Sequence, residues 1–157
     1  MNALQLRDKI IIPTLRHLSL FSESAVRLLL GTAAVESDMG SFISQVNGPA
    51  LGIYQMEPST YNCIYDNFLA YRPLLSEKIT KYKIPDIGVE QLSGNLYYAT
   101  SMARIKYYRS PRALPDKNDV KWMAMMWKND YNSVLGKGTV DKFIEKYNKH
   151  VLPCLED

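Results

Sequence analysis

Apolar residues recur at helical spacing along most of the chain. This spacing predicts helices over residues 3–11, 13–19, 21–40, 57–72, 72–83, 89–109, 118–130 and 139–151. Residues 41–56 lack the period, because Asn47-Gly48-Pro49 and Gly52 interrupt three short β-compatible pieces, and they should form an irregular loop or a very small hairpin. We therefore expect a mainly α fold with about seven or eight helices and little or no β-hairpin.

Local signals mark the ends of several of these helices. Ser22 is a candidate N-cap for the helix over 21–40, and Gly40 is a candidate for its C-terminal end. Pro58 falls in the first turn of the next helix, where a missing N–H costs nothing. The helix over 21–40 is therefore delimited at both ends.

Glu36 lies on the apolar face of this helix. At about 100° per residue, its neighbours on the wheel are Val26, Leu29, Thr32 and Ala33, whereas Glu23, Arg27 and Asp38 gather on the opposite side. A carboxyl held against apolar side chains has its pKa raised by desolvation, and the negative end of the helix dipole raises it further. A raised pKa is what a general acid requires, although a surface glutamate near a helix end is the common alternative.

Composition and charge limit the class of protein. No repeat or linker divides the 157 residues, so residues 1–157 are expected to form a single domain. An apolar fraction of 46% with 22% charged residues is typical of a globular protein. The net charge of +3 is too mild and too dispersed for nucleic-acid binding, but it is compatible with an anionic polymer such as a bacterial cell wall.

Cysteine and histidine positions give no sign of a metal or a cofactor. Cys63 and Cys154 are far apart and are expected to be unpaired thiols. His17 and His150 have no partner at metal-ligand spacing, and the "GKG" at 136–138 lacks the setting of a phosphate-binding loop. We expect neither metal nor cofactor.

Nothing at the N-terminus or elsewhere resembles a targeting or membrane segment. The first residues carry charges before a short apolar run and have no small-residue cleavage site, and no apolar window approaches the length of a membrane span. We expect synthesis in a cytoplasm without a signal peptide and no membrane partner. A substrate outside that compartment would then need a separate delivery route.

The segment "WMAMMWKND" contains a cluster of methionine and tryptophan residues. Trp122, Met125 and Met126 occur at helical spacing, and such a cluster is more often plain core than a cofactor pocket. We expect these three side chains to be buried.

Three segments in order resemble the motif series of the lysozyme-like superfamily, in particular soluble lytic transglycosylases and goose-type lysozymes. They are "VESDMG", "GPALGIYQMEPSTY" and "KNDYNSVLGKG", within a resemblance that covers roughly residues 22–150. The matched positions are Glu36-Ser37, the run 52–60 and Tyr131-Asn132. Departures are Tyr54, where the family usually has Met, and Asp130 and Ser133 on either side of Tyr-Asn. The compact length resembles that of a bacteriophage member.

The resemblance implies a lysozyme-like fold and a role for each matched residue. Glu36 would protonate the glycosidic oxygen between N-acetylmuramic acid and N-acetylglucosamine in peptidoglycan. Gln55 and Asn132 would bind sugar groups, Ser37 would orient neighbours across the cleft or cap the helix, and Tyr131 would pack beside Glu36 with its hydroxyl toward the cleft. Tyr54 would stack on a sugar. Core packing remains the alternative for both tyrosines.

The resemblance does not decide which group attacks the sugar after the glycosidic bond is broken. In lytic transglycosylases the substrate's 2-acetamido group assists and the muramyl 6-hydroxyl closes a 1,6-anhydro ring, whereas a hydrolase holds a water, often with a second carboxylate. The candidates for a second carboxylate are Asp38, Glu57, Asp66 and Asp130, each with a surface or capping role as the stronger alternative. A different class is a phage virion or baseplate component that only binds glycan or is structural. We expect a monomer unless the chain is part of a virion.

Overall fold

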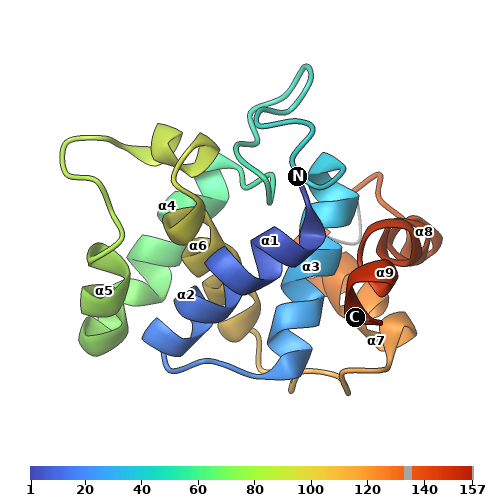
Figure 1. Ribbon diagram of the computed structural model, residues 1–157. Coiled ribbons are helices and arrows are strands. Elements are labelled where there is room, and N and C mark those ends of the chain that lie inside the picture. Colours follow the sequence, from blue (N-terminus) through green and yellow to red (C-terminus); the bar gives the residue numbers. More distant parts are fainter. Residues whose placement is uncertain (133–135, 157) are drawn as a thin grey trace.

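The computed structural model describes residues 1–132 and 136–156 and is mainly helical, as the hydrophobic pattern predicts (Figure 1). The α-helices are α1 (Ala3–Leu6), α2 (Ile12–His17), α3 (Glu23–Ser37), α4 (Pro58–Asn67), α5 (Pro73–Thr80), α6 (Leu96–Tyr108), α7 (Val120–Met126), α8 (Val140–His150) and α9 (Leu152–Leu155). Shorter helical turns cover Arg7–Ile11, Leu69–Tyr71, Val89–Ser93 and Trp127–Asn132. Within the described residues no β-strand forms.

Helix α3 is the central element of the core. Its N-terminus is capped as predicted, since the Ser22 hydroxyl accepts a hydrogen bond of 3.0 Å from the Ala25 N–H. Leu28, Leu29 and Leu30 are all almost fully buried, so neighbouring helices cover this helix on every side there. In Figure 1, α3 lies between the α4–α6 side of the molecule and the α7–α9 side.

The C-terminus of α3 differs from the prediction. The helix ends at Ser37 rather than at Gly40, because Asp38, Met39 and Gly40 all adopt positive φ angles of 50°, 56° and 80°. The Met39 N–H bonds to the Ala33 carbonyl at 3.0 Å, which closes the helix with a left-handed turn. The predicted helix end at Gly40 was wrong because a glycine permits a left-handed conformation but does not fix the residue at which the left-handed turn begins. Here the turn begins at Asp38.

The loop over 41–56 is irregular, as expected. Its only pairing among the described residues consists of isolated antiparallel bridges, Ser44 with Leu51 and Leu51 with Met56. Gly52 has a φ of +80°, and a Cβ there would lie 2.1 Å from the Leu92 carbonyl oxygen. The glycine therefore lets the loop pack against the backbone of the segment Val89–Ser93.

The predicted long helix over 89–109 is divided in two. Val89–Ser93 forms a 3-10 turn, and α6 begins only at Leu96. The Asn95 side chain accepts a 3.1 Å hydrogen bond from the Tyr98 N–H and donates one of 2.6 Å to the Tyr82 carbonyl. This cap starts a new helix, and apolar periodicity alone does not detect it.

Two further expectations concern single side chains. Trp122 was expected in the core, but it is 58% exposed, since α7 turns Met123 and Met126 inward instead. Cys63 is a free, half-buried thiol, so no disulfide joins it to Cys154, as expected.

Candidate active site

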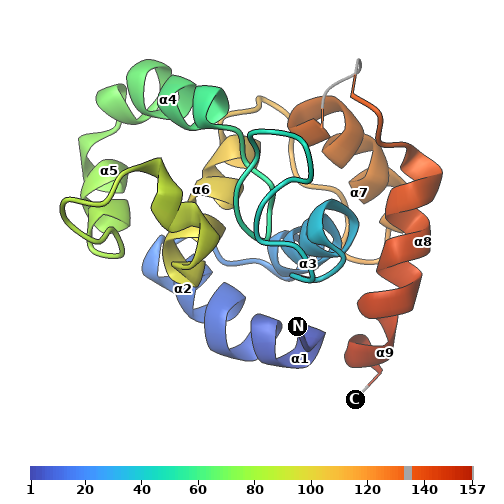
Figure 2. The same ribbon diagram turned by 90° about the horizontal axis from the view of Figure 1, so that it is seen from above.

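A cleft of about 690 Å³ opens at the C-terminal end of α3. Its lining comes from Glu36, from the loop and first turn over 45–60, from the last turn of α6, and from residues 129–132 and 136–138. Figure 2 shows α4 and α7 on opposite sides of the loop over 41–56. Segments far apart in the sequence therefore meet in one cavity.

Glu36 is a half-buried carboxyl in this cleft. Its Oε1 accepts a hydrogen bond of 2.9 Å from the indole Nε1 of Trp127. Burial raises the pKa of Glu36 to about 7, against the smaller opposing influences of the Trp127 hydrogen bond and the charge of Lys106. The pKa of Glu36 is thus shifted in the direction predicted from its apolar surroundings, and burial is the largest cause.

Trp127 holds the carboxyl from the core side. Its ring is 1% exposed and packs against Phe143 with a centroid separation of 5.6 Å. A buried indole N–H needs an acceptor, and Glu36 supplies it. Local sequence patterns do not predict this contact, because the two partners are 91 positions apart. The one sequence signal for Trp127 as a site residue was its position shortly before the Tyr131-Asn132 motif.

Lys106 brings a positive charge into the cleft. Its Nζ lies 3.8 Å from the centre of the Tyr131 ring and donates a hydrogen bond to the Tyr131 carbonyl. Burial lowers the pKa of Lys106 to about 8, although the carboxylate of Glu36 acts in the opposite direction. No pattern in the sequence distinguishes this lysine from the surface lysines of other helices.

Tyr131 lies in the cleft wall. Its hydroxyl was expected to face the cavity, but it points into the protein instead. The residue is 4% exposed, and its ring stacks on Tyr107 at a centroid distance of 5.1 Å. Its hydroxyl donates a 2.7 Å hydrogen bond to the carbonyl of Tyr54. Tyr131 therefore joins the Trp127–Asn132 turn to the loop over 41–56.

Tyr54 does not stack on a ligand in the cleft, which corrects the expectation for this residue. Its side chain is 1% exposed, and its hydroxyl shares a 2.9 Å hydrogen bond with the Thr100 hydroxyl. The ring is part of the core, where a tyrosine needs one polar partner. Only its backbone carbonyl takes part in the framework of the site, through Tyr131.

Ser37 is also a framework residue rather than a ligand-binding one. It is fully buried, and its hydroxyl donates a 2.6 Å hydrogen bond to the Ile53 carbonyl and accepts one of 2.9 Å from the Gly40 N–H. The bond from Gly40 is a helix-end contact, and the bond to Ile53 reaches the neighbouring loop, so both contacts considered for this serine are present. The serine next to Glu36 thus fastens the end of α3 to the loop that carries Gln55.

Gln55 and Asn132 both line the cleft. Gln55 has a φ of 48°, and its Nε2 donates a 2.9 Å hydrogen bond to the Gly52 carbonyl. The Asn132 Oδ1 accepts a 3.1 Å hydrogen bond from the Nζ of Lys128. Both amides are therefore held in fixed positions beside the cavity. Ser133, which follows them in the motif, lies outside the described residues.

The four candidate second carboxylates lie in different surroundings. Glu57 and Asp130 line the cleft, Asp66 is exposed on α4, and Asp38 pairs with α8. Asp130 accepts a 3.1 Å hydrogen bond from Ser110 and lies 3.6 Å from the guanidinium of Arg112.

The described part of the chain contains no group of three or more His, Cys, Asp or Glu side chains arranged to hold a metal ion. No helix among the described residues has the length and apolar character needed to cross a membrane. Searches of protein-family models, characterised proteins and solved structures gave no match to this chain.

Proposed function

We propose that this protein cleaves the glycan strands of peptidoglycan between N-acetylmuramic acid and N-acetylglucosamine, with Glu36 as the general acid. The observation that carries the proposal is a carboxyl with a pKa of about 7, held in the wall of a 690 Å³ cleft. At neutral pH such a group is partly protonated, so it can give a proton and take one back. The ordered motif resemblance supports glycan as the substrate.

The residues around Glu36 suit this chemistry. The indole N–H of Trp127 fixes the orientation of the carboxyl. After the proton reaches the glycosidic oxygen, the ammonium of Lys106 stabilises the carboxylate that remains. The carboxylate then acts as a base toward the attacking hydroxyl. The amides of Gln55 and Asn132 are available to orient sugar hydroxyl or N-acetyl groups.

The attacking group defines two versions of the reaction. In the transglycosylase version the muramyl 6-hydroxyl attacks and gives a 1,6-anhydro end. In the lysozyme version water attacks and gives a reducing end. The second carboxylate of the lysozyme version would be Asp130 or Glu57, which both line the cleft. Mass spectrometry of the released muropeptides distinguishes them, because the products differ by one water. A phage enzyme of this kind would act in host lysis or in penetration of the wall.

The test is the substitution Glu36→Gln, which keeps the size of the side chain and an acceptor for Trp127 but removes the proton. We expect a folded protein that no longer reduces the turbidity of purified cell walls. The matched control is Glu23→Gln, an exposed position on the same helix, which should retain wild-type activity.

Circular dichroism and thermal unfolding establish that both variants are folded. Substantial activity in folded Glu36→Gln would contradict the proposed mechanism. A wild-type protein that binds purified walls without releasing any fragment would instead favour the non-catalytic virion role.

A further inference from the structure

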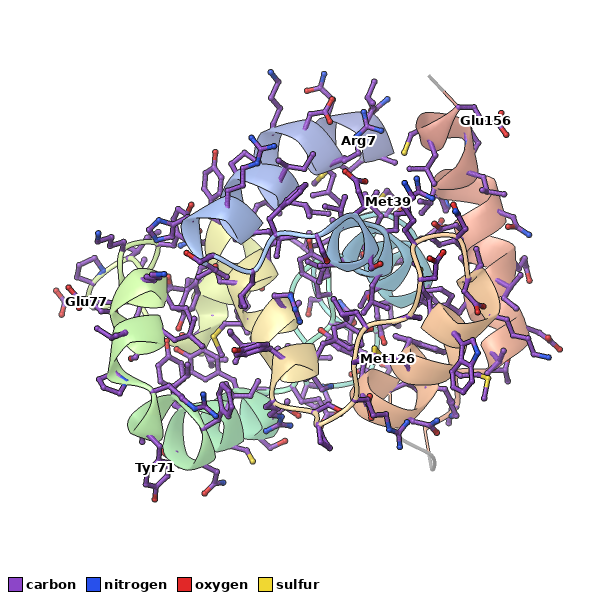
Figure 3. All side chains as sticks on the ribbon, turned by 90° about the horizontal axis from the view of Figure 1, so that it is seen from below. Arg7, Met39, Tyr71, Glu77, Met126 and Glu156 are labelled. Carbon is purple, nitrogen blue, oxygen red and sulfur yellow. The ribbon has the colours of Figure 1, made fainter. Side chains whose placement is uncertain are left out.

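A second hollow, of about 510 Å³, lies between α7 and the segment that joins α6 to α7. This segment runs along the bottom of Figure 1 and crosses the face seen in Figure 3, on which Met126 of α7 is labelled. Trp122, Met125 and Pro115 supply its apolar lining, and Arg112 and Asn129 are among its polar residues. We call this hollow the Trp122 site.

Trp122 presents an exposed indole to this hollow. Of the two tryptophans in the chain, Trp127 is 1% exposed, whereas Trp122 is 58% exposed although the core lies one turn away. A hollow with an aromatic side chain in its wall and a few polar groups at its edge is the form that ligand sites commonly take. The lining of the Trp122 site therefore suits a ligand that has both an apolar face and polar edges.

The Trp122 site adjoins the cleft that contains Glu36. Asn129 lines both cavities. Arg112 of the Trp122 site also lies 3.6 Å from Asp130 of the cleft wall. The two hollows thus share Asn129 and are adjacent at the Arg112–Asp130 pair, so a chain-like ligand that fills the cleft has Trp122 within reach past Asn129.

A pyranose ring fits the Trp122 site better than a purely apolar partner does. The C–H face of a sugar packs on an indole, while its hydroxyl and N-acetyl groups need donors and acceptors at the edge. The guanidinium of Arg112, the carboxylate of Asp116 and the amide of Asn129 provide both kinds of group. A lipid surface or an apolar protein face would leave these polar groups without partners.

We propose that the Trp122 site binds a sugar of the same glycan strand that occupies the cleft, beyond the residues joined by the bond that is cleaved. This inference rests on the proposed function and extends it, because it makes the enzyme selective for long strands. Binding at a distance from the reacting bond lowers the barrier for long substrates only.

The kinetic test is Trp122→Ala, compared with wild type on long soluble glycan strands and on fragments too short to reach from the cleft to Trp122. We expect kcat/KM to fall about tenfold on long strands, the order of a single aromatic contact, and to stay unchanged on short fragments. The matched control is Tyr71→Ala, since Tyr71 is 76% exposed but lies at another edge of the molecule (Figure 3). An equal effect on both substrates, or none on either, would overturn the proposal.

A binding test separates this inference from the proposed chemistry. In Glu36→Gln, acrylamide should quench mainly the fluorescence of Trp122, because Trp127 is buried. Long glycan strands should protect Trp122 from quenching, and short fragments should not. Protection by phospholipid vesicles alone, or protection that depends only on protein concentration, would show that a membrane or a second copy occupies the site and would overturn the proposal. Activity in folded Glu36→Gln, by contrast, would contradict the mechanism and not the binding site.

Discussion

At the scale of single residues, the protonation of Glu36 depends on burial and on two neighbours that oppose it. The apolar surroundings favour the neutral acid, whereas the indole N–H of Trp127 and the ammonium of Lys106 favour the carboxylate. Burial is the largest of these influences, so the pKa lies near 7 rather than near the ordinary value of 4.5. Small changes at Lys106 should therefore move the pH range in which the acid works.

The substitution Lys106→Met tests this balance. In wild type, kcat/KM on cell-wall glycan should fall as the pH rises through about 7, because Glu36 loses its proton. Removal of the ammonium destabilises the carboxylate, so the pKa of Glu36 rises and the falling limb should move to higher pH, by about half to one unit.

The matched control for this experiment is Lys121→Met, an exposed position on α7, which should leave the pH profile unchanged. A limb that stays in place or moves to lower pH in Lys106→Met would show that this lysine does not act on Glu36. A uniform loss of activity at every pH would indicate only a structural role.

At the scale of elements, the contact between α3 and α8 supports the floor of the cleft. Gly31 of α3 faces Phe143 and Tyr147 of α8, and a Cβ at this position would lie 2.4 Å from the Phe143 ring atom Cζ. Phe143 in turn packs on Trp127, the partner of Glu36. The absence of a side chain at position 31 therefore sets how closely α8 approaches the site.

The substitution Gly31→Ala should destabilise the protein by about 1–3 kcal/mol, because Phe143 must leave its position in a packed core. This loss outweighs the gain in helix propensity of about 1 kcal/mol. Urea unfolding at constant pH measures the difference. The matched control is Gly94→Ala, where a Cβ meets no atom within 4 Å. Equal stability of the two variants would contradict the close packing of α3 on α8.

At the scale of the whole molecule, Asp38 links the C-terminal end of α3 to the C-terminal part of the chain. Its Oδ1 lies 2.9 Å from the Lys146 Nζ and 2.8 Å from the His150 Nε2. These hydrogen bonds lower the pKa of Asp38 to about 2. The same contacts hold the left-handed turn that follows α3, and Glu36 lies in the last turn of that helix.

The substitution Asp38→Asn should lower stability at neutral pH by about 1 kcal/mol or less, because the pair is partly exposed to solvent. Asparagine tolerates the left-handed backbone, so the change isolates the charge. Because the folded pKa is depressed, the wild-type advantage should be complete above about pH 4 and vanish as the pH falls toward 2. Thermal unfolding across this range measures it, and a constant difference at all pH values would contradict the ionic origin.

Much of the fold follows from local patterns. The hydroxyl of Ser22 and the ring of Pro58 start α3 and α4 where the sequence indicates. The apolar period predicts most of the helices, but it extends α6 too far because the cap at Asn95 depends on a contact with Tyr82. Burial of individual side chains is less predictable, as the exposed Trp122 shows.

The sequence by itself determined the mainly α class and the position of Glu36 on an apolar face, since both depend on local spacings, each within a single helix. The tertiary structure decided what surrounds that carboxyl: Trp127 and Lys106 at the acid, and Ser37 and Tyr54 in the framework beneath the cleft. It also decided that Trp122 faces solvent beside the cleft. These features require distant segments to meet, and periodicity along the chain carries no information about which segments do so.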